Sequence, residues 1–311
     1  MLVSHSVKMM GTTIDIAIHS NNPKNDIQEV CHLLTVYNKR FSANDDDSEL
    51  MMINRQAGIG AVKVHPELFE LIKLGKEHSL AEPSNLNIAI GPLVQSWRIG
   101  FDDATVPSSE TISEKLALTN PELIQLDSCQ KSVFLSQKGM KIDLGALAKG
   151  YIADRIIQHL SEKQVTAALI NLGGNVLVHG SNPNREDGSW WIGIQKPEEK
   201  RGTNVGVLAV TNQSVVTSGI YERHLLVDGQ DYHHIFDKKT GYPIETDMAS
   251  LTIVSDLSTD CEIWTTRLFG LPIIQAMMTI NEIAHIEGII ITKDNRLIVS
   301  EGLKQHFRLY Y

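Results

Sequence analysis

Cysteine is scarce in this chain. Its 311 residues include three cysteines, Cys31, Cys129 and Cys261, which are widely spaced and form no CxxC pair. An odd, dispersed set of this kind argues against a disulfide framework and against a thiolate metal site. A chain of this length can bury a substantial core, as one large domain or two modest ones, so it needs no cross-links to fold. We therefore expect a reducing compartment and a cytoplasmic location.

The sequence also lacks an excess of positive charge and long apolar runs. Lys and Arg number 28 against 37 Asp and Glu, and no stretch of the sequence concentrates them. The electrostatic footprint of a protein that binds nucleic acid or an anionic membrane is therefore missing. No run of about 18 apolar residues occurs, and the first residues show no pattern of a secretion signal. We expect no nucleic-acid partner and no membrane anchor.

Several widespread catalytic motifs are absent. The sequence contains no GxxxxGK[ST], GxGxxG, HExxH or GxSxG pattern. Their absence argues against a P-loop nucleotide site, a dinucleotide-binding fold, a zinc-protease helix and a hydrolase nucleophile turn. Any catalytic or binding residues must therefore lie in other sequence patterns.

Apolar spacing predicts helices and clustered strands. Helices are predicted over 22–41, 66–80, 146–161 and 258–270. Strands are predicted over 7–18, where a glycine interrupts the run, and over 132–136, 140–144, 166–171, 174–179, 190–195, 205–210 and 214–217. A late hairpin is predicted around Asp294-Asn295. Because the strands are too clustered for regular βαβ alternation, we predict an α+β fold with a largely antiparallel sheet and packed helices.

The stretch KIDLGALAKGYIADRI, residues 141–156, joins a predicted strand to a predicted helix. Asp143 ends the strand, small residues follow, and Lys149 lies in the first helical turn. Free backbone N–H groups and a cation at a helix start suit an anionic ligand. The pattern also fits a corner in which glycine permits close packing and Asp143 caps the helix. The stretch alone leaves both interpretations open.

Two further stretches place glycine or histidine at strand ends. The two glycines of NLGGN, residues 171–175, would allow a ligand to approach the backbone, although a plain turn explains them as well. In YHHIFDKKTGYP, residues 232–243, strand alternation places His233 and His234 on opposite faces, so only one can serve a given site. That histidine is either a proton acceptor or a structural residue.

The stretch TDCEIWTTRLFG, residues 259–270, is predicted to be helical. Glu262 and Thr266 are then four residues apart, on one face of the helix. Hard oxygen donors at that spacing suit Mg²⁺, which usually keeps waters and adds substrate phosphate oxygens. A local hydrogen bond on a solvated helix face is the simpler explanation of the spacing.

In their order and spacing, these stretches resemble the ApbE-type flavin transferases. The resembling blocks are MGTT (10–13), FSANDDDSEL (41–50), NIAIGPLVQSW (87–97), IDLGALAKGYIAD (142–154), ALINLGGNV (168–176), TSGIYER (217–223), HHIFDKKTGYP (233–243) and EIWTTRLFG (262–270). The resemblance implies one ApbE-like, T-fold-like domain over 1–311, with two lobes around an FAD site as the alternative arrangement.

The resemblance also implies a reaction. Such enzymes cleave FAD with Mg²⁺ and transfer FMN through a phosphoester bond to a threonine or serine of an acceptor flavoprotein, releasing AMP. The acceptor would carry a D-x-x-[ST]-G-A-[ST] motif. Two alternatives remain, an Mg²⁺-dependent FAD pyrophosphatase that yields FMN and AMP, and a flavin-binding protein without catalysis.

Site residues follow from the resemblance block by block. Those implied to contact FAD are Met10, Asn44, Asn85, Leu86, Asn87, Asp143, Lys149 and Phe236. Mg²⁺ would bind the Ala146 carbonyl and the side chains of Glu262 and Thr266, and His234 would be the base. Three positions depart from the family pattern, because Glu262, Asn87 and Ile220 stand where aspartate is usual. These departures predict either a changed choice of acceptor or a weakened paralogue.

Overall fold

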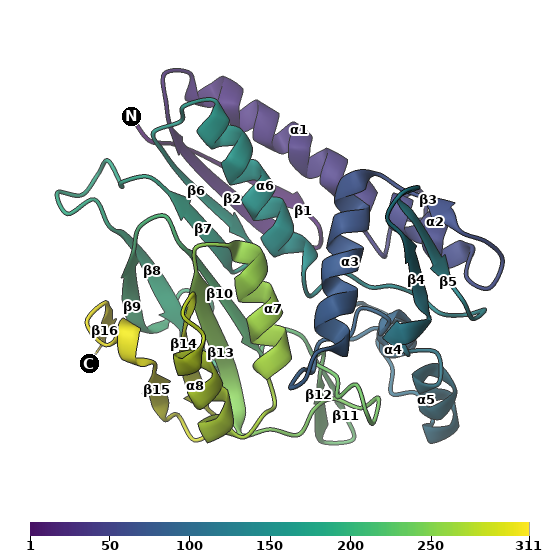
Figure 1. The fold of residues 1–311 in the computed structure, drawn as a ribbon. Coiled ribbons are helices and arrows are strands. Elements are labelled where there is room, and N and C mark those ends of the chain that lie inside the picture. Colours follow the sequence, from purple (N-terminus) through teal and green to yellow (C-terminus); the bar gives the residue numbers. More distant parts are fainter. Residues whose placement is uncertain (311) are drawn as a thin grey trace.

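An eight-stranded antiparallel sheet forms the centre of the structure, a computed structural model that describes residues 1–310 (Figure 1). Every neighbouring pair of its strands is antiparallel. In spatial order the strands are β1 (Val3–Met9), β2 (Thr12–His19), β6 (Ala167–Leu172), β7 (Asn175–His179), β10 (Ser214–Gly219), β13 (Met248–Ser255), β14 (Ile286–Thr292) and β15 (Leu297–Val299). The predicted α+β class with a largely antiparallel sheet is confirmed.

Helices cover one face of this sheet, and a smaller sheet covers part of the other (Figure 1). The covering helices are α1 (Pro23–Phe41), α6 (Ala148–Glu162), α7 (Ser258–Leu268) and α8 (Ile273–Glu282). The smaller sheet contains β8 (Trp190–Gln195), β9 (Asn204–Val210) and β16 (Phe307–Leu309). All eight residues of β13 are buried because both faces of that strand are covered.

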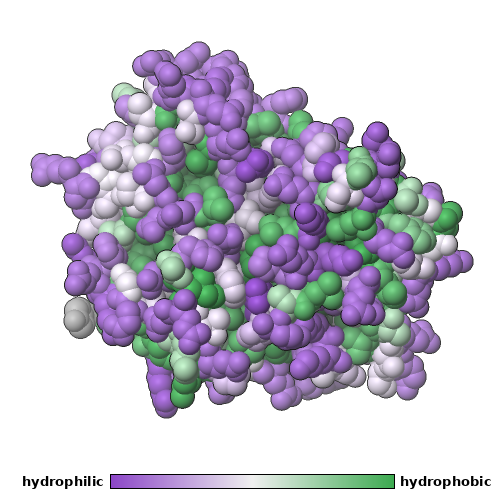
Figure 2. Space-filling model, viewed as in Figure 1, coloured by the Kyte–Doolittle hydropathy of each residue, from purple (hydrophilic) through white to green (hydrophobic). Residues whose placement is uncertain are grey.

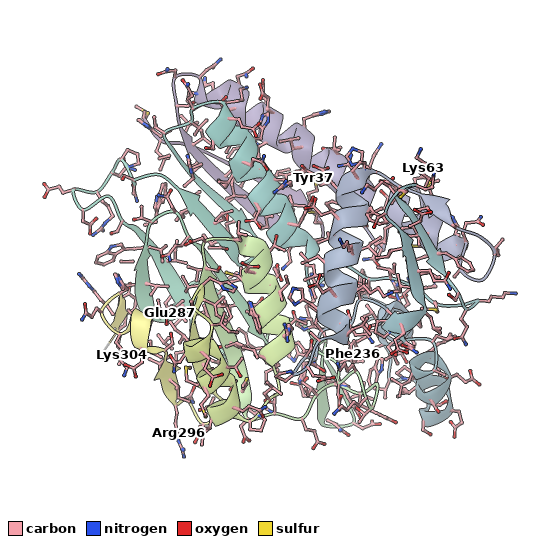
Figure 3. All side chains as sticks on the ribbon, viewed as in Figure 1. Tyr37, Lys63, Phe236, Glu287, Arg296 and Lys304 are labelled. Carbon is pink, nitrogen blue, oxygen red and sulfur yellow. The ribbon has the colours of Figure 1, made fainter. Side chains whose placement is uncertain are left out.

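The remaining elements lie mostly beside the large sheet. They include α2 (Glu49–Arg55), α3 (Pro66–Leu80), α4 (Gly91–Trp97), α5 (Ser109–Leu116) and 3₁₀ turns at Pro121–Leu123 and Glu301–Leu303. A second small sheet consists of β3 (Val62–Lys63), β5 (Ser132–Leu135) and β4 (Ile124–Asp127), and β11 (His224–Val227) pairs with β12 (Gln230–His233). The packed side chains of all these elements are drawn in Figure 3.

Two sequence predictions about strands were wrong. The run over 7–18 is two strands, because Met10 and Gly11 have φ of 53° and 70° and form a two-residue hairpin loop. The run over 140–144 forms only one isolated bridge, between Lys141 and Ile90. Its residues alternate in burial as in a strand, but the Ile142 N–H donates to the side chain of Asn54 instead of to a neighbouring strand. The segment is therefore an extended loop.

The visible face of the molecule is mainly hydrophilic, with hydrophobic groups in scattered patches (Figure 2). Ile274 and Met278 of α8 are among the exposed apolar side chains. No helix within residues 1–310 combines the length and the apolar content that a membrane crossing requires.

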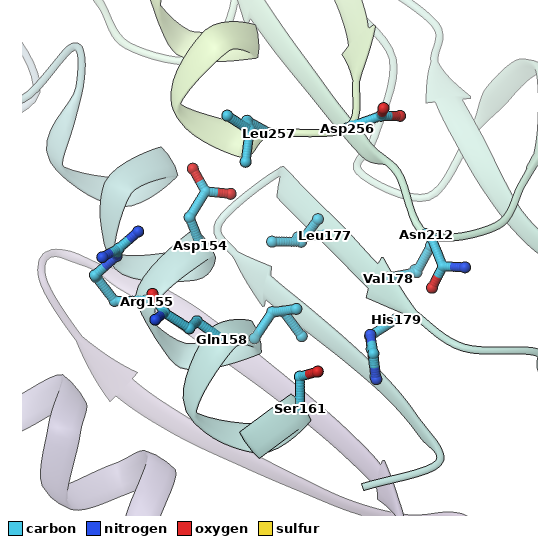
Figure 4. A pocket seen from close by; sticks show the side chains of 11 residues that line it. Asp154, Arg155, Gln158, Ser161, Leu177, Val178, His179, Asn212, Asp256 and Leu257 are labelled. Carbon is cyan, nitrogen blue, oxygen red and sulfur yellow. The ribbon is translucent and has the colours of Figure 1, made fainter. Parts of the chain in front are cut away.

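Asp154 on α6 holds the start of α7. Its carboxylate accepts hydrogen bonds from the backbone N–H groups of Ser258 and Thr259, both at 2.8 Å, and from the Thr259 hydroxyl. Figure 4 shows Asp154 beside Leu257, in the wall of a cavity of about 330 Å³. Because Leu257 precedes the helix and provides no side-chain cap, Asp154 takes that role from another helix.

We expect Asp154→Ala to lower the free energy of unfolding by about 2–3 kcal/mol, because three buried donors lose a charged acceptor. Chemical denaturation followed by circular dichroism measures the change. Gln158→Ala, an exposed position in the wall of the same cavity, is the control and should change stability by less than about 0.5 kcal/mol. Equal stability of the two variants would contradict the capping role.

Candidate active site

The first turns of α6 and α7 pack directly against each other. A Cβ atom placed on Gly150 would lie 2.5 Å from the Ser258 carbonyl oxygen and 2.8 Å from Glu262 Cγ. Only glycine therefore lets the two helices approach this closely. The close approach brings the start of α6, with Lys149, beside the carboxylate of Glu262.

The N-terminus of α6 has no side-chain cap. Leu147 precedes the helix and contributes no capping hydrogen bond. Asp143 does not cap it either, because its Oδ1 accepts from the Gly145 N–H at 2.7 Å. Capping by Asp143, one of the two interpretations that the sequence left open, is therefore wrong. Within residues 1–310, the N–H groups of Lys149 and Gly150 have no hydrogen-bond partner. Free N–H groups at the positive end of a helix dipole form an anion site.

Glu262 is a buried carboxylate, 4% exposed, on the face of α7 that meets α6. Its Oε1 accepts a hydrogen bond from Asn175 Nδ2 at 2.9 Å and lies 3.5 Å from Lys149 Nζ. Its Oε2 has no partner among the described residues. A carboxylate oxygen without a protein partner, on a side chain that is otherwise buried, suits a cation.

Two further oxygen atoms close to these helices are also available. The Ala146 carbonyl accepts no hydrogen bond within residues 1–310, although the next carbonyl, of Leu147, accepts one from Tyr151. The Thr266 hydroxyl lies one turn after Glu262 on α7. No cluster of three His, Cys, Asp or Glu side chains in the described chain could hold a metal. A carbonyl, a carboxylate and a hydroxyl are instead the hard donors that Mg²⁺ accepts.

His234 follows β12 and presents a proton acceptor. Its Nδ1 lies 3.2 Å from the carbonyl oxygen of Arg223, which also accepts from the His234 backbone N–H. Since a carbonyl can only accept, Nδ1 carries the proton and Nε2 has the free lone pair. Burial, with the nearby charges of Arg223 and Lys149, lowers the pKa of His234 to about 4. The imidazole is therefore neutral at physiological pH.

Asp143 lies on the loop that leads into α6. Burial of its carboxyl raises the pKa, while the Gly145 N–H and the charge of Arg223 act in the opposite direction. The side chain still has some access to solvent, so it can meet a ligand at the helix start. The candidate site thus combines an anion site at the start of α6, a cation site and a neutral base. Its residues are Asp143, Lys149, Glu262 and His234.

Comparison with known proteins agrees with this arrangement. The model of the ApbE family matches residues 10–290. The chain belongs to the ApbE family. It is 41% identical to an FAD:protein FMN transferase of Klebsiella pneumoniae over 304 residues, which cover 98% of this chain and 93% of that one. It is 33% identical to an FAD:protein FMN transferase of Treponema pallidum, with coverage of 98% and 89%.

The fold also matches a solved member of the ApbE family. The crystal structure of the ApbE protein from Thermotoga maritima aligns with a TM-score of 0.90 at 27% identity, covering 99% of this chain and all of that one. The ApbE-like architecture predicted from the sequence is confirmed.

The residues that the ApbE resemblance assigned to FAD differ in how free their side chains are. Asn85 donates to the Phe236 carbonyl at 2.9 Å and accepts from Lys238 N. Leu86 is 1% exposed, so only its backbone can face a ligand. The Phe236 ring is buried, lies 5.8 Å from the Trp97 ring and is labelled in Figure 3. These three residues shape the wall of the site more than they offer free groups to it.

The other two asparagines assigned to FAD, Asn87 and Asn44, have different environments. Asn87 donates to the Thr119 carbonyl at 2.8 Å and accepts from the Ala89 N–H. An ionised aspartate could not make the first of these bonds, which accounts for the amide at this ApbE position. Asn44 is exposed on the loop between α1 and α2 and makes no hydrogen bond to another candidate residue within residues 1–310.

The remaining assigned positions lie at the edge of the site. Met10 occupies the β1–β2 hairpin loop, and a Cβ on the adjacent Gly11 would lie 3.9 Å from Arg223 Nη2. Ile220 packs against the apolar cluster that contains Met248 and Phe269, which suits a neutral side chain. A cavity of about 570 Å³ beside the site includes Asn85 in its wall.

One organising residue was missed by sequence reasoning. Arg267 on α7 is 7% exposed, and its Nε and Nη2 donate to the Pro83 carbonyl at 3.3 and 3.0 Å. Its own carbonyl accepts from the Asn85 N–H at 3.0 Å. Arg267 therefore fastens the loop 82–87 to the helix that carries Glu262. Its place in the EIWTTRLFG block was the only available signal.

Proposed function

We infer that this chain is an FAD:protein FMN transferase, which transfers FMN from FAD to a hydroxyl of an acceptor flavoprotein and releases AMP. The relatives of 41% and 33% identity carry that name, and they align over nearly the whole chain. The observation that carries the proposal is the free N-terminus of α6 beside the buried Glu262 carboxylate. It provides an anion site and a cation site side by side, as a diphosphate with a divalent cation requires.

Residues at the start of α6 would bind the FAD diphosphate. The free N–H groups of Lys149 and Gly150 can donate to phosphate oxygens, and the Lys149 ammonium adds a positive charge. The hydrogen bond from the Asn85 side chain to the Phe236 backbone carbonyl holds the adjoining wall in place. Positioning of this kind supplies much of the catalysis in phosphoryl transfer.

The Ala146 carbonyl and the Glu262 and Thr266 side chains would hold Mg²⁺. When bound, Mg²⁺ supplies neutralisation of the charge that develops on the phosphate oxygens. The residues fit the ion, because the Ala146 carbonyl and Glu262 Oε2 have no partner within residues 1–310.

His234 would accept the proton of the attacking hydroxyl at Nε2. The acceptor oxygen forms a bond to the phosphorus on the flavin side while the bond between that phosphorus and the bridging oxygen breaks. AMP leaves with the bridging oxygen. The Nδ1 bond to the Arg223 carbonyl keeps the lone pair on Nε2 throughout the approach.

The test uses the full chain with FAD, Mg²⁺ and an acceptor protein that carries a D-x-x-[ST]-G-A-[ST] motif. We expect the intact mass of the acceptor to increase by one FMN less one water, with AMP released in equal amount. An acceptor in which alanine replaces the final serine or threonine is the control and should stay unmodified.

Two outcomes would contradict the transferase proposal. Free FMN and AMP without a modified acceptor would indicate a pyrophosphatase that uses water as the nucleophile. Tight FAD binding with intact FAD recovered, and no effect of Mg²⁺, would indicate a flavin-binding protein. The cytoplasmic location expected from the sequence stays a prediction.

A further inference from the structure

Asn175, the last residue of the NLGGN stretch, lies between two groups of α7. It opens β7 and is 1% exposed. Its Nδ2 donates to Glu262 Oε1 at 2.9 Å, and its Oδ1 accepts from the Ser258 hydroxyl at 2.8 Å. Both polar ends of the buried amide are therefore bound to the helix that carries Glu262.

The orientation of this amide is determined by its neighbours. A reversed amide would place Oδ1 against the Glu262 carboxylate, where two acceptors face each other without a proton. Ser258 is itself fixed, because it is fully buried and its N–H donates to Asp154. The donor of Asn175 thus always faces Glu262.

The consequence for Glu262 is a restricted carboxylate. Glutamate has one more rotatable bond than aspartate, so a free Glu262 would populate more positions. Gly150 lies against its Cγ, and Asn175 holds Oε1. Oε2 has no partner in the described chain. Because Oε1 and Cγ are held, Oε2 keeps one position.

We propose that Asn175 is a positioning residue that holds Glu262 Oε1 and thereby presents Oε2 to the divalent cation. The proposal rests on the proposed function for the nature of that cation. It gives the NLGGN stretch a specific structural role. The two glycines lead into β7, and Asn175 begins that strand where its amide reaches Glu262 on α7. The lone turn that the sequence also allowed does not account for the bond to Glu262.

The test measures binding of Mn²⁺, an analogue of Mg²⁺ that also takes oxygen ligands, to the full chain without FAD. Electron paramagnetic resonance of free Mn²⁺ gives the affinity. Asn175→Leu should weaken binding by about 10- to 100-fold, the usual effect of removing a partner of a metal ligand. FMN transfer by this variant should recover as Mg²⁺ is raised, which a collapsed site would not allow.

A pair of serine variants serves as the matched comparison if Asn175→Leu does not fold. Ser258→Ala removes the bond to Asn175, whereas Ser214→Ala, at an equally buried serine, removes a bond to the Val176 carbonyl that does not involve Glu262. We expect weaker Mn²⁺ binding for Ser258→Ala and unchanged binding for Ser214→Ala. Wild-type affinity in folded Ser258→Ala and Asn175→Leu would overturn this inference alone. Failure of the unaltered chain to bind Mn²⁺ would overturn the ion site together with it.

Discussion

Glu262→Gln should reduce kcat for FMN transfer by about 10³-fold, because losing the proposed divalent cation would remove several kcal/mol of stabilisation from the transition state. Glutamine keeps the size of the side chain, so the contact with Gly150 remains. The substitution removes the negative charge that would attract the proposed ion. FAD binding, measured by quenching of flavin fluorescence, should change much less than kcat, since the α6 N-terminus is unaltered.

A buried carboxylate elsewhere in the chain provides the control. Asp26 on α1 is 6% exposed, accepts from the Ser20 hydroxyl at 2.5 Å and lies outside the site. Asp26→Asn should retain wild-type kcat at a temperature where it is folded. The role of Glu262 would be refuted by a Glu262→Gln enzyme whose kcat and Mg²⁺ dependence match those of the unaltered chain.

His234→Ala should lower kcat by about 10²- to 10⁴-fold, the range that a general base contributes. The loss follows because Nε2 is the free proton acceptor of a neutral imidazole. Acceptor flavinylation followed by mass spectrometry measures it. His224→Ala is the matched control, since this exposed histidine lies on the same hairpin and pairs with Asp231. If both variants modified the acceptor equally fast, His234 would not be the base.

The pH dependence of kcat/KM for the unaltered enzyme also tests whether His234 is the base. Burial lowers the pKa of His234 to about 4, so the imidazole stays neutral and able to accept a proton well below pH 7. The acidic limb of kcat/KM should therefore lie below about pH 5, and a limb near the ordinary histidine value of about 6.5 would contradict the assignment. The folded chain binds this proton less readily than the unfolded chain does. The contribution of His234 to stability consequently falls as pH decreases from about 6.5 toward 4.

Much of the fold could be predicted because its elements have regular apolar spacing. Helix α3 matches its predicted bounds, and α1 begins one residue later than predicted. The loop 140–144 could not be predicted, because its residues alternate in burial like a strand. Only the three-dimensional structure shows that Ile142 bonds to the side chain of Asn54, which is 88 positions away.

The candidate site was predicted as blocks of sequence and not as contacts. In the structure, the blocks that contain Lys149 and Glu262 meet where α6 packs against α7 at Gly150. The roles that the resemblance gave to these two residues stay predictions. The bonds of Asn175 and Arg267 could not be derived, because each joins segments more than 80 positions apart. A single asparagine or arginine has no local spacing that reveals such a partner.

Arg267 affects when the site becomes ordered. It fastens loop 82–87 to α7, and Asn85 then fastens that loop to the segment after β12. These bonds form as the chain folds, so the loss of conformational entropy in the loop occurs during folding and not when FAD arrives. FAD binding then does not have to offset the entropy cost of ordering this loop, which is the advantage of a preorganised site.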